Sequence, residues 1–375
     1  MRVGLFSDSY YTVDGVSSYV YFLTKNLKKL GHEPYLFVPE NRYQKNEDEH
    51  IISFMSLPFP FYAGYRFALF PYFKVFKEAR EKKLDIIHIH TPFFMGTSGF
   101  FSGRDMGIPI VGTFHTNFLS LNDMFNTLAI KMAWLYNMGI YWRCDQLIVP
   151  SETIKNFLIS HARKPFRKEI KIIPNGIDLQ YVQSFSYNKD VKSILGLDDS
   201  KYLVTYIGRL TKDKGVYKIL DAAKKLSNVD EILFVIAGKG PAEHSLRENA
   251  KKLKNVKVLG YIEEKYKFSL LKDSTIFLLP SKSDVFSIAM LEAMYMKAYV
   301  IASDIGGNKD VLDYGKRGFL FDYSNPNGLA ETILKIIKDV DRYSYVKESA
   351  YNYVVNVANM DNVSKKISEV YEELA

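Results

Sequence analysis

The chain has 375 residues, 47% of them hydrophobic and 25% charged, and its formal net charge is +8. A chain of this length exceeds one ordinary core and indicates two domains, and the composition is that of a globular protein. The one cysteine, Cys144, excludes an internal disulfide, and the diffuse positive charge suits an anionic small molecule or membrane surface better than a nucleic acid.

Short apolar runs recur along the chain and are separated by amphipathic stretches. The stretch 17–30 is typical of a helix, because it closes at Gly31, a natural helix end. The runs predict buried strands at 3–6, 33–38, 86–90, 110–113, 146–149 and 170–173, and then at 202–207, 232–237, 256–259, 275–279 and 299–302. This alternation predicts an α/β fold of two Rossmann-like, doubly wound domains, with the ligand site in the interdomain cleft.

A polar stretch from about 178 to 201 divides the strands into two series. We assign residues 1–180 to an N-terminal domain, 181–197 to a linker and 198–357 to a C-terminal domain. A helix rich in lysine and glutamate is predicted over 360–374. The sequence leaves open whether this last segment, about 358–375, packs back on the first domain.

Two segments of the first domain follow predicted strands. Asp14-Gly15-Val16-Ser17 precedes the first helix, where glycine permits close approach of a ligand and the helix end offers N–H groups. Taken alone, the segment is better explained as an ordinary strand-to-helix turn with Ser17 as its cap. His115 comes just after the strand at 110–113 and is expected to point into the cleft, although a lone histidine is more often structural.

In the second domain, the run Gly-Arg-Leu-Thr-Lys-Asp-Lys-Gly at 208–215 follows the first strand. Arg209 and Lys214 can neutralise a diphosphate, one as a planar fork and the other as a point charge. The alternative is a solvated, charged loop, and the spacing is not that of a Walker loop. The Gly-x-Gly ending at Gly240 lacks the third glycine of a dinucleotide fingerprint, which argues against hydride transfer.

The segment 280–294 carries two acids, Asp284 and Glu292, with an apolar helix start between them. We expect Asp284 in the loop before the helix and Glu292 about two turns down it, where the pair can bind vicinal hydroxyls. The N–H groups of residues 286–288 can meet a phosphate or a hydroxyl. The alternative is that Asp284 caps the helix and Glu292 is a surface residue, but a glutamate among apolar neighbours needs a partner.

Together these segments resemble the retaining glycosyltransferases of family four, which have the GT-B fold and include enzymes that glycosylate lipids. The resemblance covers nearly the whole chain and depends on the order and spacing of its motifs. Besides the segments above, they are Pro-Ser-Glu at 150–152, Ile-Pro-Asn-Gly-Ile-Asp at 173–178 and Ala-Ser-Asp-Ile-Gly-Gly at 302–307. The pattern around 90–96 also looks like diacylglycerol glucosyltransferases.

The resemblance implies a role for each matching residue. Arg209 and Lys214 would hold the donor diphosphate, Asp284 the hydroxyls of the transferred sugar and Glu292 those of the ribose. His115 would lie beside the sugar, and the N–H of Gly15 would contact the phosphate from the opposite domain. The implied catalytic residues are His115, Arg209, Lys214 and Asp284. The implied donor-binding residues are Gly15, Val16, Gly240, Phe286, Ser287, Ile288 and Glu292.

The implied reaction moves a hexose from a UDP- or GDP-sugar to an acceptor, with retention and an α-glycoside product. No cofactor and no metal are expected, and the one Asp-x-Asp, at 339–341, is interpreted as solvated surface. Three positions depart from the family pattern. Asp284 stands where glutamate is usual, Ala298 where glycine is frequent, and Asp310 where glutamate follows the paired glycines.

The acceptor is expected to be a membrane lipid. Residues 58–83 and 143–171 each carry a net charge of +4, and the first stretch is dense in aromatic residues, a mixture that suits an anionic bilayer surface. A core role for these aromatic residues is the alternative. The N-terminus lacks the features of a signal peptide and no run of eighteen apolar residues occurs, so we expect a cytoplasmic protein, peripheral on the cytosolic face of the membrane.

Two other functions remain open on the sequence. One is transfer to a soluble or polyprenyl-linked saccharide in polysaccharide or N-glycan assembly. The other is a nucleotide-sugar-binding protein without catalysis, which only the shorter acid at Asp284 suggests. Nucleic acid is not expected as a partner.

Overall fold

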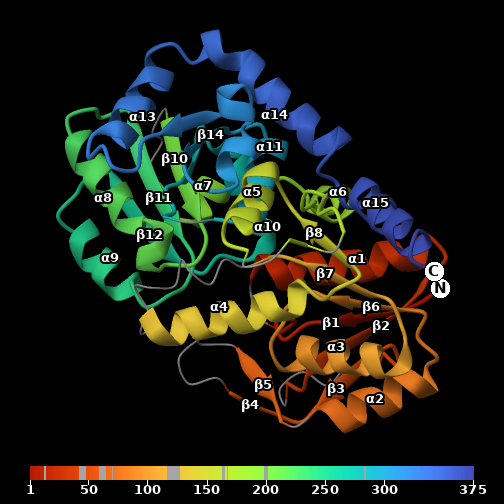
Figure 1. The fold of residues 1–375 in the computed structure, drawn as a ribbon. Coiled ribbons are helices and arrows are strands. Elements are labelled where there is room, and N and C mark those ends of the chain that lie inside the picture. The colour runs from red at the N-terminus through yellow and green to blue at the C-terminus, as the bar shows by residue number, and fades with distance from the viewer. Residues whose placement is uncertain are drawn as a thin grey trace. The chain divides into compact units, whose positions relative to one another are not determined.

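The computed structural model describes residues 1–11, 14–41, 48–58, 65–69, 71–115, 127–162, 165–166, 168–197, 202–282 and 284–375. They form two compact units (Figure 1). The first consists of Met1–Gly176 with Met360–Ala375, and the second is Ile177–Asn359.

The first unit contains a seven-stranded parallel sheet in the order β3-β2-β1-β6-β7-β8-β9. Its strands are β1 (Arg2–Phe6), β2 (Glu33–Pro39), β3 (Ile51–Phe54), β6 (Ile86–Ile89), β7 (Ile110–Thr113), β8 (Gln146–Val149) and β9 (Lys171–Ile172), and a separate antiparallel hairpin joins β4 (Ser56–Pro58) to β5 (Arg66–Ala68). The helices are α1 (Gly15–Lys29), α2 (Tyr72–Glu81), α3 (Phe94–Met106), α4 (Thr127–Tyr141), α5 (Glu152–Ser160) and α15 (Met360–Glu372).

The second unit contains a six-stranded parallel sheet in the order β12-β11-β10-β13-β14-β15. Its strands are β10 (Tyr202–Ile207), β11 (Ile232–Ala237), β12 (Val256–Gly260), β13 (Ile276–Leu279), β14 (Tyr299–Ser303) and β15 (Phe319–Phe321). The helices are α6 (Leu179–Gln183), α7 (Val191–Ile194), α8 (Val216–Lys225), α9 (Glu243–Ala250), α10 (Glu264–Asp273), α11 (Ile288–Tyr295), α12 (Asn308–Val311), α13 (Gly328–Lys338) and α14 (Ser344–Asn356), with short 3₁₀ turns η2 (Lys212–Lys214), η3 (Asp313–Gly315) and η4 (Asp341–Tyr343).

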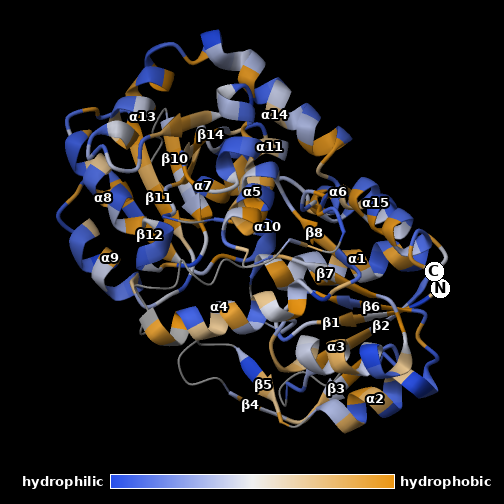
Figure 2. Ribbon diagram, viewed as in Figure 1, coloured by the Kyte–Doolittle hydropathy of each residue, from blue (hydrophilic) through white to orange (hydrophobic). Residues whose placement is uncertain are grey.

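Each sheet is buried on both faces, as parallel sheets require. In the second unit, alternate residues of the central strands enter separate cores. Phe234 and Ile236 pack beneath α8, α9 and α13, whereas Phe277 and Leu279 pack beneath α10, α11 and α14. Figure 2 shows the consequence: β10, β11 and β14 are hydrophobic, while α8 and α9 alternate between hydrophilic and hydrophobic residues.

The C-terminal helix α15 belongs to the first unit. Val363 and Ile367 are fully buried beside Leu23 and Leu27 of α1. Lysine and glutamate occupy much of its other face, so this amphipathic helix covers one side of the first sheet. The structure thus answers the question that the sequence left open about residues 358–375.

Each unit has the doubly wound α/β fold that the strand pattern predicts. Residues 181–197, expected as a linker, differ from the prediction, because they lie in the second unit. Val182 and Val191 are buried there in two different cores. The polar composition of this stretch gave no indication that the two valines are buried, since their neighbours in the sequence are exposed or half-buried.

Candidate functional site

The second sheet has a topological switch point between β10 and β13, since β10 pairs with β11 on one side and with β13 on the other. Ligands of doubly wound folds bind at the carboxyl ends of strands beside such a point. Here β10 leads into the loop that carries Arg209 and Lys214, and β13 leads into the loop that carries Asp284. The strand order therefore brings three residues from two separate parts of the sequence to one edge.

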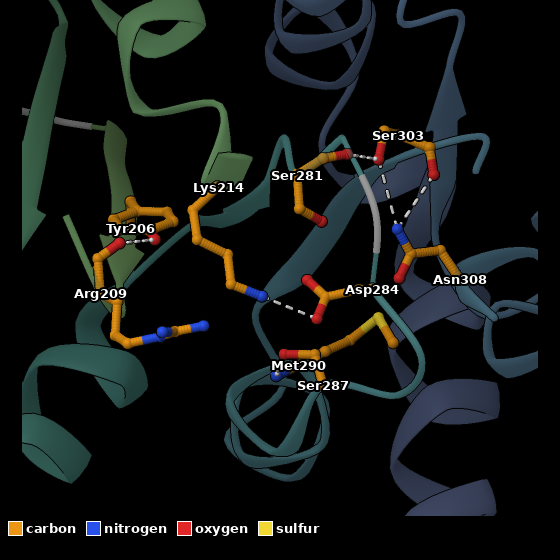
Figure 3. A network of polar contacts seen from close by, with 9 residues as sticks. All are labelled: Tyr206, Arg209, Lys214, Ser281, Asp284, Ser287, Met290, Ser303 and Asn308. Atoms are coloured by element: carbon orange, nitrogen blue, oxygen red, sulfur yellow. Dashed lines mark hydrogen bonds and ion pairs between the residues drawn. The ribbon is translucent and has the colours of Figure 1, made fainter. Parts of the chain in front are cut away.

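Lys214 and Asp284 form an ion pair at this edge (Figure 3). The Nζ of Lys214 lies 2.9 Å from Oδ1 of Asp284, and the side chains are 17% and 13% exposed. The second carboxylate oxygen, Oδ2, is buried without a hydrogen-bond partner in the described part of the chain. In the absence of a ligand, Asp284 thus compensates the charge of Lys214 and keeps one acceptor unused.

Arg209 leaves the end of β10 beside Tyr206. The Tyr206 hydroxyl donates a 2.7 Å hydrogen bond to the carbonyl oxygen of Arg209 and fixes the backbone of this residue. Burial raises the pKa of Tyr206 well above its ordinary value, so the phenol stays a donor. In Figure 3 the guanidinium of Arg209 points toward the Lys214–Asp284 pair. Two cations and one carboxylate thus meet at the strand ends.

Three glycines allow the loops of this edge to touch through their backbones. A Cβ at Gly215, where φ is +68°, would lie 1.7 Å from the carbonyl oxygen of Pro280. A Cβ at Gly238 would lie 1.8 Å from the carbonyl oxygen of Gly208, and one at Gly240 would lie 2.3 Å from that of Leu210. Gly240, expected as a donor-binding residue, packs under the Arg209 loop in this structure.

Polar atoms that lack partners gather in the same loops. Within the described ranges, the hydroxyl of Ser281 and the Oδ1 of Asn308 are buried without a hydrogen bond. Ser303 holds the two loops together, because its hydroxyl donates a 2.6 Å bond to the Ser281 carbonyl and its own carbonyl accepts a 3.1 Å bond from Asn308 (Figure 3). With Oδ2 of Asp284, these atoms offer hydrogen bonds to a ligand rich in hydroxyl groups.

Glu292 lies on α11 and pairs with Lys267 of α10, with 2.8 Å between Nζ and Oε1. Each of the two side chains is 13% exposed. Burial lowers the pKa of Lys267, but the carboxylates of Glu292 and Glu264 outweigh it and leave that pKa above its ordinary value. Glu292 is therefore the partnered, buried carboxylate that its apolar neighbours predict, and Lys267 is a residue that sequence reasoning missed.

The start of α11 excludes one alternative and corrects one expectation. The N-cap is Ser287, whose hydroxyl accepts a 3.3 Å bond from the Met290 N–H, and not Asp284. Because the helix begins at Ile288, Glu292 lies just over one turn from its start, and not two turns. Phe286 and Ser287 lie in the connection before the helix, and Ser283 of this motif lies outside the described residues.

The first unit has its own switch point, between β1 and β6. Gly15 and Val16 start α1 there, but Asp14 is the N-cap, and its Oδ1 accepts a 2.8 Å bond from the Ser17 N–H. Ser17 is thus not the cap; its hydroxyl bonds the carbonyl of Tyr10. A carboxylate already stands at the helix end where a phosphate contact is expected, and residues 12–13 of this loop are not described.

Two further polar residues at this edge escaped the sequence analysis. Asp8 follows β1, and its carboxylate accepts bonds from the Thr91 hydroxyl and the Met95 N–H at 2.9 and 3.0 Å, so it holds the start of α3. Burial raises the pKa of Asp8 to about 7. His90 follows β6 and bonds His115, with 3.1 Å between the ring nitrogens. Their shared signal was a polar residue within two positions of the end of a buried strand.

The described residues lack two features that other proteins use to cross a membrane or to hold a metal ion. No helix among them is both long and apolar enough to cross a bilayer. Within the same ranges, no group of three or more histidine, cysteine or acidic side chains is arranged to hold a metal ion. Asp339 and Asp341 are exposed, as the sequence predicts.

Comparison with known proteins connects both units to one class of enzyme. Residues 13–181 match the family model "Glycosyltransferase Family 4", and residues 188–353 match the model "Glycosyl transferases group 1". The chain is 28% identical to alpha-monoglucosyldiacylglycerol synthase of Streptococcus pneumoniae over 390 residues, which cover 99% of this chain and 85% of that protein. It is 27% identical to phosphatidyl-myo-inositol mannosyltransferase of Mycolicibacterium smegmatis over 384 residues, which cover 100% of this chain and 94% of that protein.

Solved structures agree on the fold. The sucrose-phosphate synthase of Thermosynechococcus elongatus superimposes with a TM-score of 0.78 at 17% identity, covering 100% of this chain and 98% of that one. Anabaena HepE in complex with UDP-glucose gives a TM-score of 0.80 at 18% identity and full coverage of both chains. With its two parallel-sheet units and its two matching family models, the chain belongs to the family 4 glycosyltransferases and has the GT-B fold.

Proposed function

We propose that this glycosyltransferase moves a hexose from a UDP- or GDP-sugar to a membrane lipid with retention, giving an α-glycoside. The observation that carries the donor half of the proposal is the edge of the second sheet, where Arg209 and Lys214 meet Asp284 at a switch point. Cationic side chains at such an edge suit a diphosphate, and adjacent unpaired acceptors suit sugar hydroxyls.

In the proposed reaction, the bond between the anomeric carbon and the diphosphate oxygen breaks while the acceptor oxygen bonds the same face of that carbon. The acceptor's hydroxyl proton passes to the departing phosphate oxygen. Arg209 and Lys214 stabilise the charge that develops on the diphosphate, so the proposal needs neither a metal nor a cofactor. Asp284 would hold hydroxyls of the transferred sugar and Glu292 those of the ribose.

The names of two relatives support a lipid acceptor, since one is an alpha-monoglucosyldiacylglycerol synthase and the other a phosphatidyl-myo-inositol mannosyltransferase. The first unit adds a physical argument. Phe73 on α2 is 82% exposed, and Lys74, Lys77 and Arg80 are exposed on the same helix. Aromatic and basic side chains exposed together suit peripheral binding to an anionic bilayer. Residues 59–64, 70, 163–164 and 167 of the two basic stretches are not described.

Thermal shift with UDP-, GDP- and ADP-sugars tests the donor, because a bound donor raises the melting temperature by mass action. Transfer to diacylglycerol and to phosphatidylinositol is then measured with the stabilising donor, with and without EDTA. We expect a glycolipid whose anomeric proton coupling is that of an α-linkage, in undiminished yield with EDTA. A β-linked product, or transfer to saccharides but not to lipids, would contradict the proposal.

A further inference from the structure

Two buried histidines lie side by side at the carboxyl ends of neighbouring strands in the first unit. His90 follows β6 and His115 lies two residues beyond β7. Nδ1 of His90 and Nε2 of His115 are 3.1 Å apart, which is hydrogen-bond distance. The rings are nearly parallel, with their centroids 5.4 Å apart, and the ring of Tyr19 from α1 packs edge-on against His115 at 4.8 Å.

The hydrogen bond between these rings contains one proton, which is carried either by Nδ1 of His90 or by Nε2 of His115. The environment of the two rings decides which of the two nitrogens carries it. Burial lowers the pKa of His115 to about 3 and that of His90 well below its ordinary value, so both rings are neutral. A neutral imidazole has one N–H and one bare nitrogen. Either His90 donates from Nδ1 and His115 accepts at Nε2, or the reverse holds.

The other nitrogen of His90 decides between the two arrangements. Nε2 of His90 is buried and has no hydrogen-bond partner among the described residues. If His115 were the donor, this nitrogen would carry a buried N–H without an acceptor, and buried orphan donors are rarer than under-satisfied acceptors. With His90 as donor, the bare nitrogen is an unused acceptor instead. The arrangement in which His90 donates to His115 is therefore favoured.

The direction of this hydrogen bond determines which nitrogen of His115 carries its proton. Once its Nε2 accepts the bond from His90, the one proton of this neutral ring must be on Nδ1. In the part of the chain that the structure describes, no residue hydrogen-bonds to Nδ1 of His115, and this atom is not among the buried orphans. None of the described residues therefore competes with a ligand for this N–H.

The neighbouring histidine shows that the pair is distinct from the structural core. Nδ1 of His88 lies 2.6 Å from the Tyr371 hydroxyl of α15, and its Nε2 lies 2.7 Å from the Thr113 hydroxyl. Both nitrogens of His88 are thus satisfied inside the unit. His90 and His115, by contrast, share one hydrogen bond that uses one nitrogen of each ring. This arrangement fixes the His115 ring and leaves its second nitrogen for a partner outside the core.

We propose that His90 is a positioning residue, which fixes His115 as a neutral Nδ1–H donor toward an oxygen of the sugar or of the acceptor. His115 then neither takes a proton from the acceptor nor carries a positive charge during transfer. The inference rests on the proposed function for the identity of the ligand, but the proton's position on His115 does not depend on it.

Long-range ¹H–¹⁵N NMR spectra of the full chain labelled with ¹⁵N-histidine test the tautomer directly. The His115 signals are assigned by their loss in His115→Gln. We expect the correlation pattern of an Nδ1–H tautomer in the wild type, and a proton on Nε2 would overturn the proposal. This readout needs no activity, so a chain that transfers no sugar would refute the proposed function while leaving the tautomer result intact.

Variants of His90 test the positioning role. His90→Leu removes the donor, whereas His90→Asn places an amide N–H where Nδ1 stood. We expect kcat to fall by about tenfold to a hundredfold in His90→Leu with little change in the donor KM, and to recover in His90→Asn. The His115 signals should change to a mixture of tautomers only in His90→Leu. His32→Asn, which alters a histidine bonded to Ser368 in the same unit, serves as the control. Wild-type turnover in His90→Leu would overturn the role.

Discussion

Asp284 is one of the positions at which the chain departs from the pattern that it otherwise resembles, and the structure gives this side chain a partner. Its Oδ1 is bound to Lys214 at 2.9 Å, and both side chains are largely buried. A pair in this setting is stronger than a surface ion pair, because less water screens it. A diphosphate that binds Lys214 must therefore compete with Asp284 for the same ammonium group.

Removing the charge of Asp284 should separate binding from transfer. In Asp284→Asn, Lys214 loses its internal counter-ion, so we expect the nucleoside diphosphate to bind several-fold more tightly, while kcat falls by about tenfold or more because a sugar contact is lost. Calorimetric titration with UDP or GDP and a steady-state assay measure the two effects. Asp284→Glu, which keeps the charge, is the matched control. Weaker diphosphate binding in Asp284→Asn would show that Asp284 does not compete for Lys214.

Lys267 is expected to maintain Glu292 as a carboxylate. Replacement by methionine leaves a buried acid without its cation, and we expect this to cost about 3 kcal/mol of unfolding free energy and to weaken donor binding. Urea unfolding and calorimetry measure both effects. The double variant Lys267→Met, Glu292→Gln should regain part of the lost stability, since no buried charge remains. Lys265→Met, which alters an exposed lysine of the same helix, should be close to neutral.

At the scale of elements, the central strands were predictable, and so were the edge strands β9 and β12, but the edge strands β3 and β15 were not. Runs such as Ile232–Ala237 are apolar at every position, because both faces are buried, and this signal needs no knowledge of the partners. The edge strands β3 and β15 are only four and three residues long and half-buried in part, so their patterns do not differ from those of loops. The β4–β5 hairpin gives an even weaker sequence pattern, because β4 has three residues and its middle residue, Leu57, is exposed although it is apolar.

The candidate site shows a similar division. Arg209, Lys214, Asp284 and Glu292 could be found from motifs, since each carries charge next to a strand end or an apolar helix. Their pairing could not, because it depends on side chains from different elements. Nothing in the spacing of Lys267 and Glu292 indicates that 2.8 Å separates their charged atoms, and nothing near Asp284 in the sequence indicates Lys214.

The junction between η2 and α8 sets the position of Lys214. Gly215 has φ +68°, and a Cβ there would lie 1.7 Å from the Pro280 carbonyl oxygen. Gly215→Ala should therefore lower stability by more than about 1 kcal/mol and weaken nucleotide binding, because the Lys214 loop must move away from the Asp284 loop. Urea unfolding and calorimetry are the measurements. Gly196→Ala carries the same left-handed strain at φ +64° but no atom lies within 4 Å, so it should cost less and leave binding intact.

Helix α2 is the element on which membrane binding should depend. Its buried face carries Val75 and Ala79, so Phe73 and Lys77 can be changed without loss of the core. We expect Phe73→Ser with Lys77→Glu to reduce flotation with anionic vesicles by about tenfold, since both the apolar and the electrostatic contributions fall. Tyr345→Ser, which removes an aromatic residue that is 63% exposed in the second unit, is the control. Equal flotation of all three proteins would assign the binding to another surface.

At the scale of the whole molecule, the C-terminal helix α15 contacts the buried histidines of the first unit. Tyr371 of α15 is fully buried and bonds His88, which packs against the ring of His90 with centroids 4.1 Å apart. Helix α15 thus contributes to the core of the first unit, although the second unit separates it along the chain from the other elements of that core. The stability of this unit should therefore depend on the protonation of the buried histidines in its core.

The pH dependence of stability follows from two opposing sets of groups. Burial lowers the pKa of His88 to about 3 and that of His90 well below its ordinary value, whereas it raises the pKa of Asp8 to about 7. Below about pH 6.5 the unfolded chain takes up protons on these histidines that the native chain excludes, so they reduce stability as the pH falls. Asp8 acts in the opposite direction, because between about pH 7 and pH 4 the native chain holds a proton that the unfolded chain has lost.

The two buried histidines, with His115, outweigh the single carboxyl, so the unfolding free energy should be lower at pH 5 than at pH 7. One histidine with an unfolded pKa near 6.5 that stays neutral when folded contributes about 2 kcal/mol to this difference. His90→Asn should therefore shrink the drop by about 2 kcal/mol in urea unfolding, while His244→Gln, a change at an exposed histidine of the second unit, should leave it unchanged. A drop of equal size in His90→Asn would mean that His90 is protonated in the native chain. The neutral pair on which the tautomer of His115 depends would then not exist.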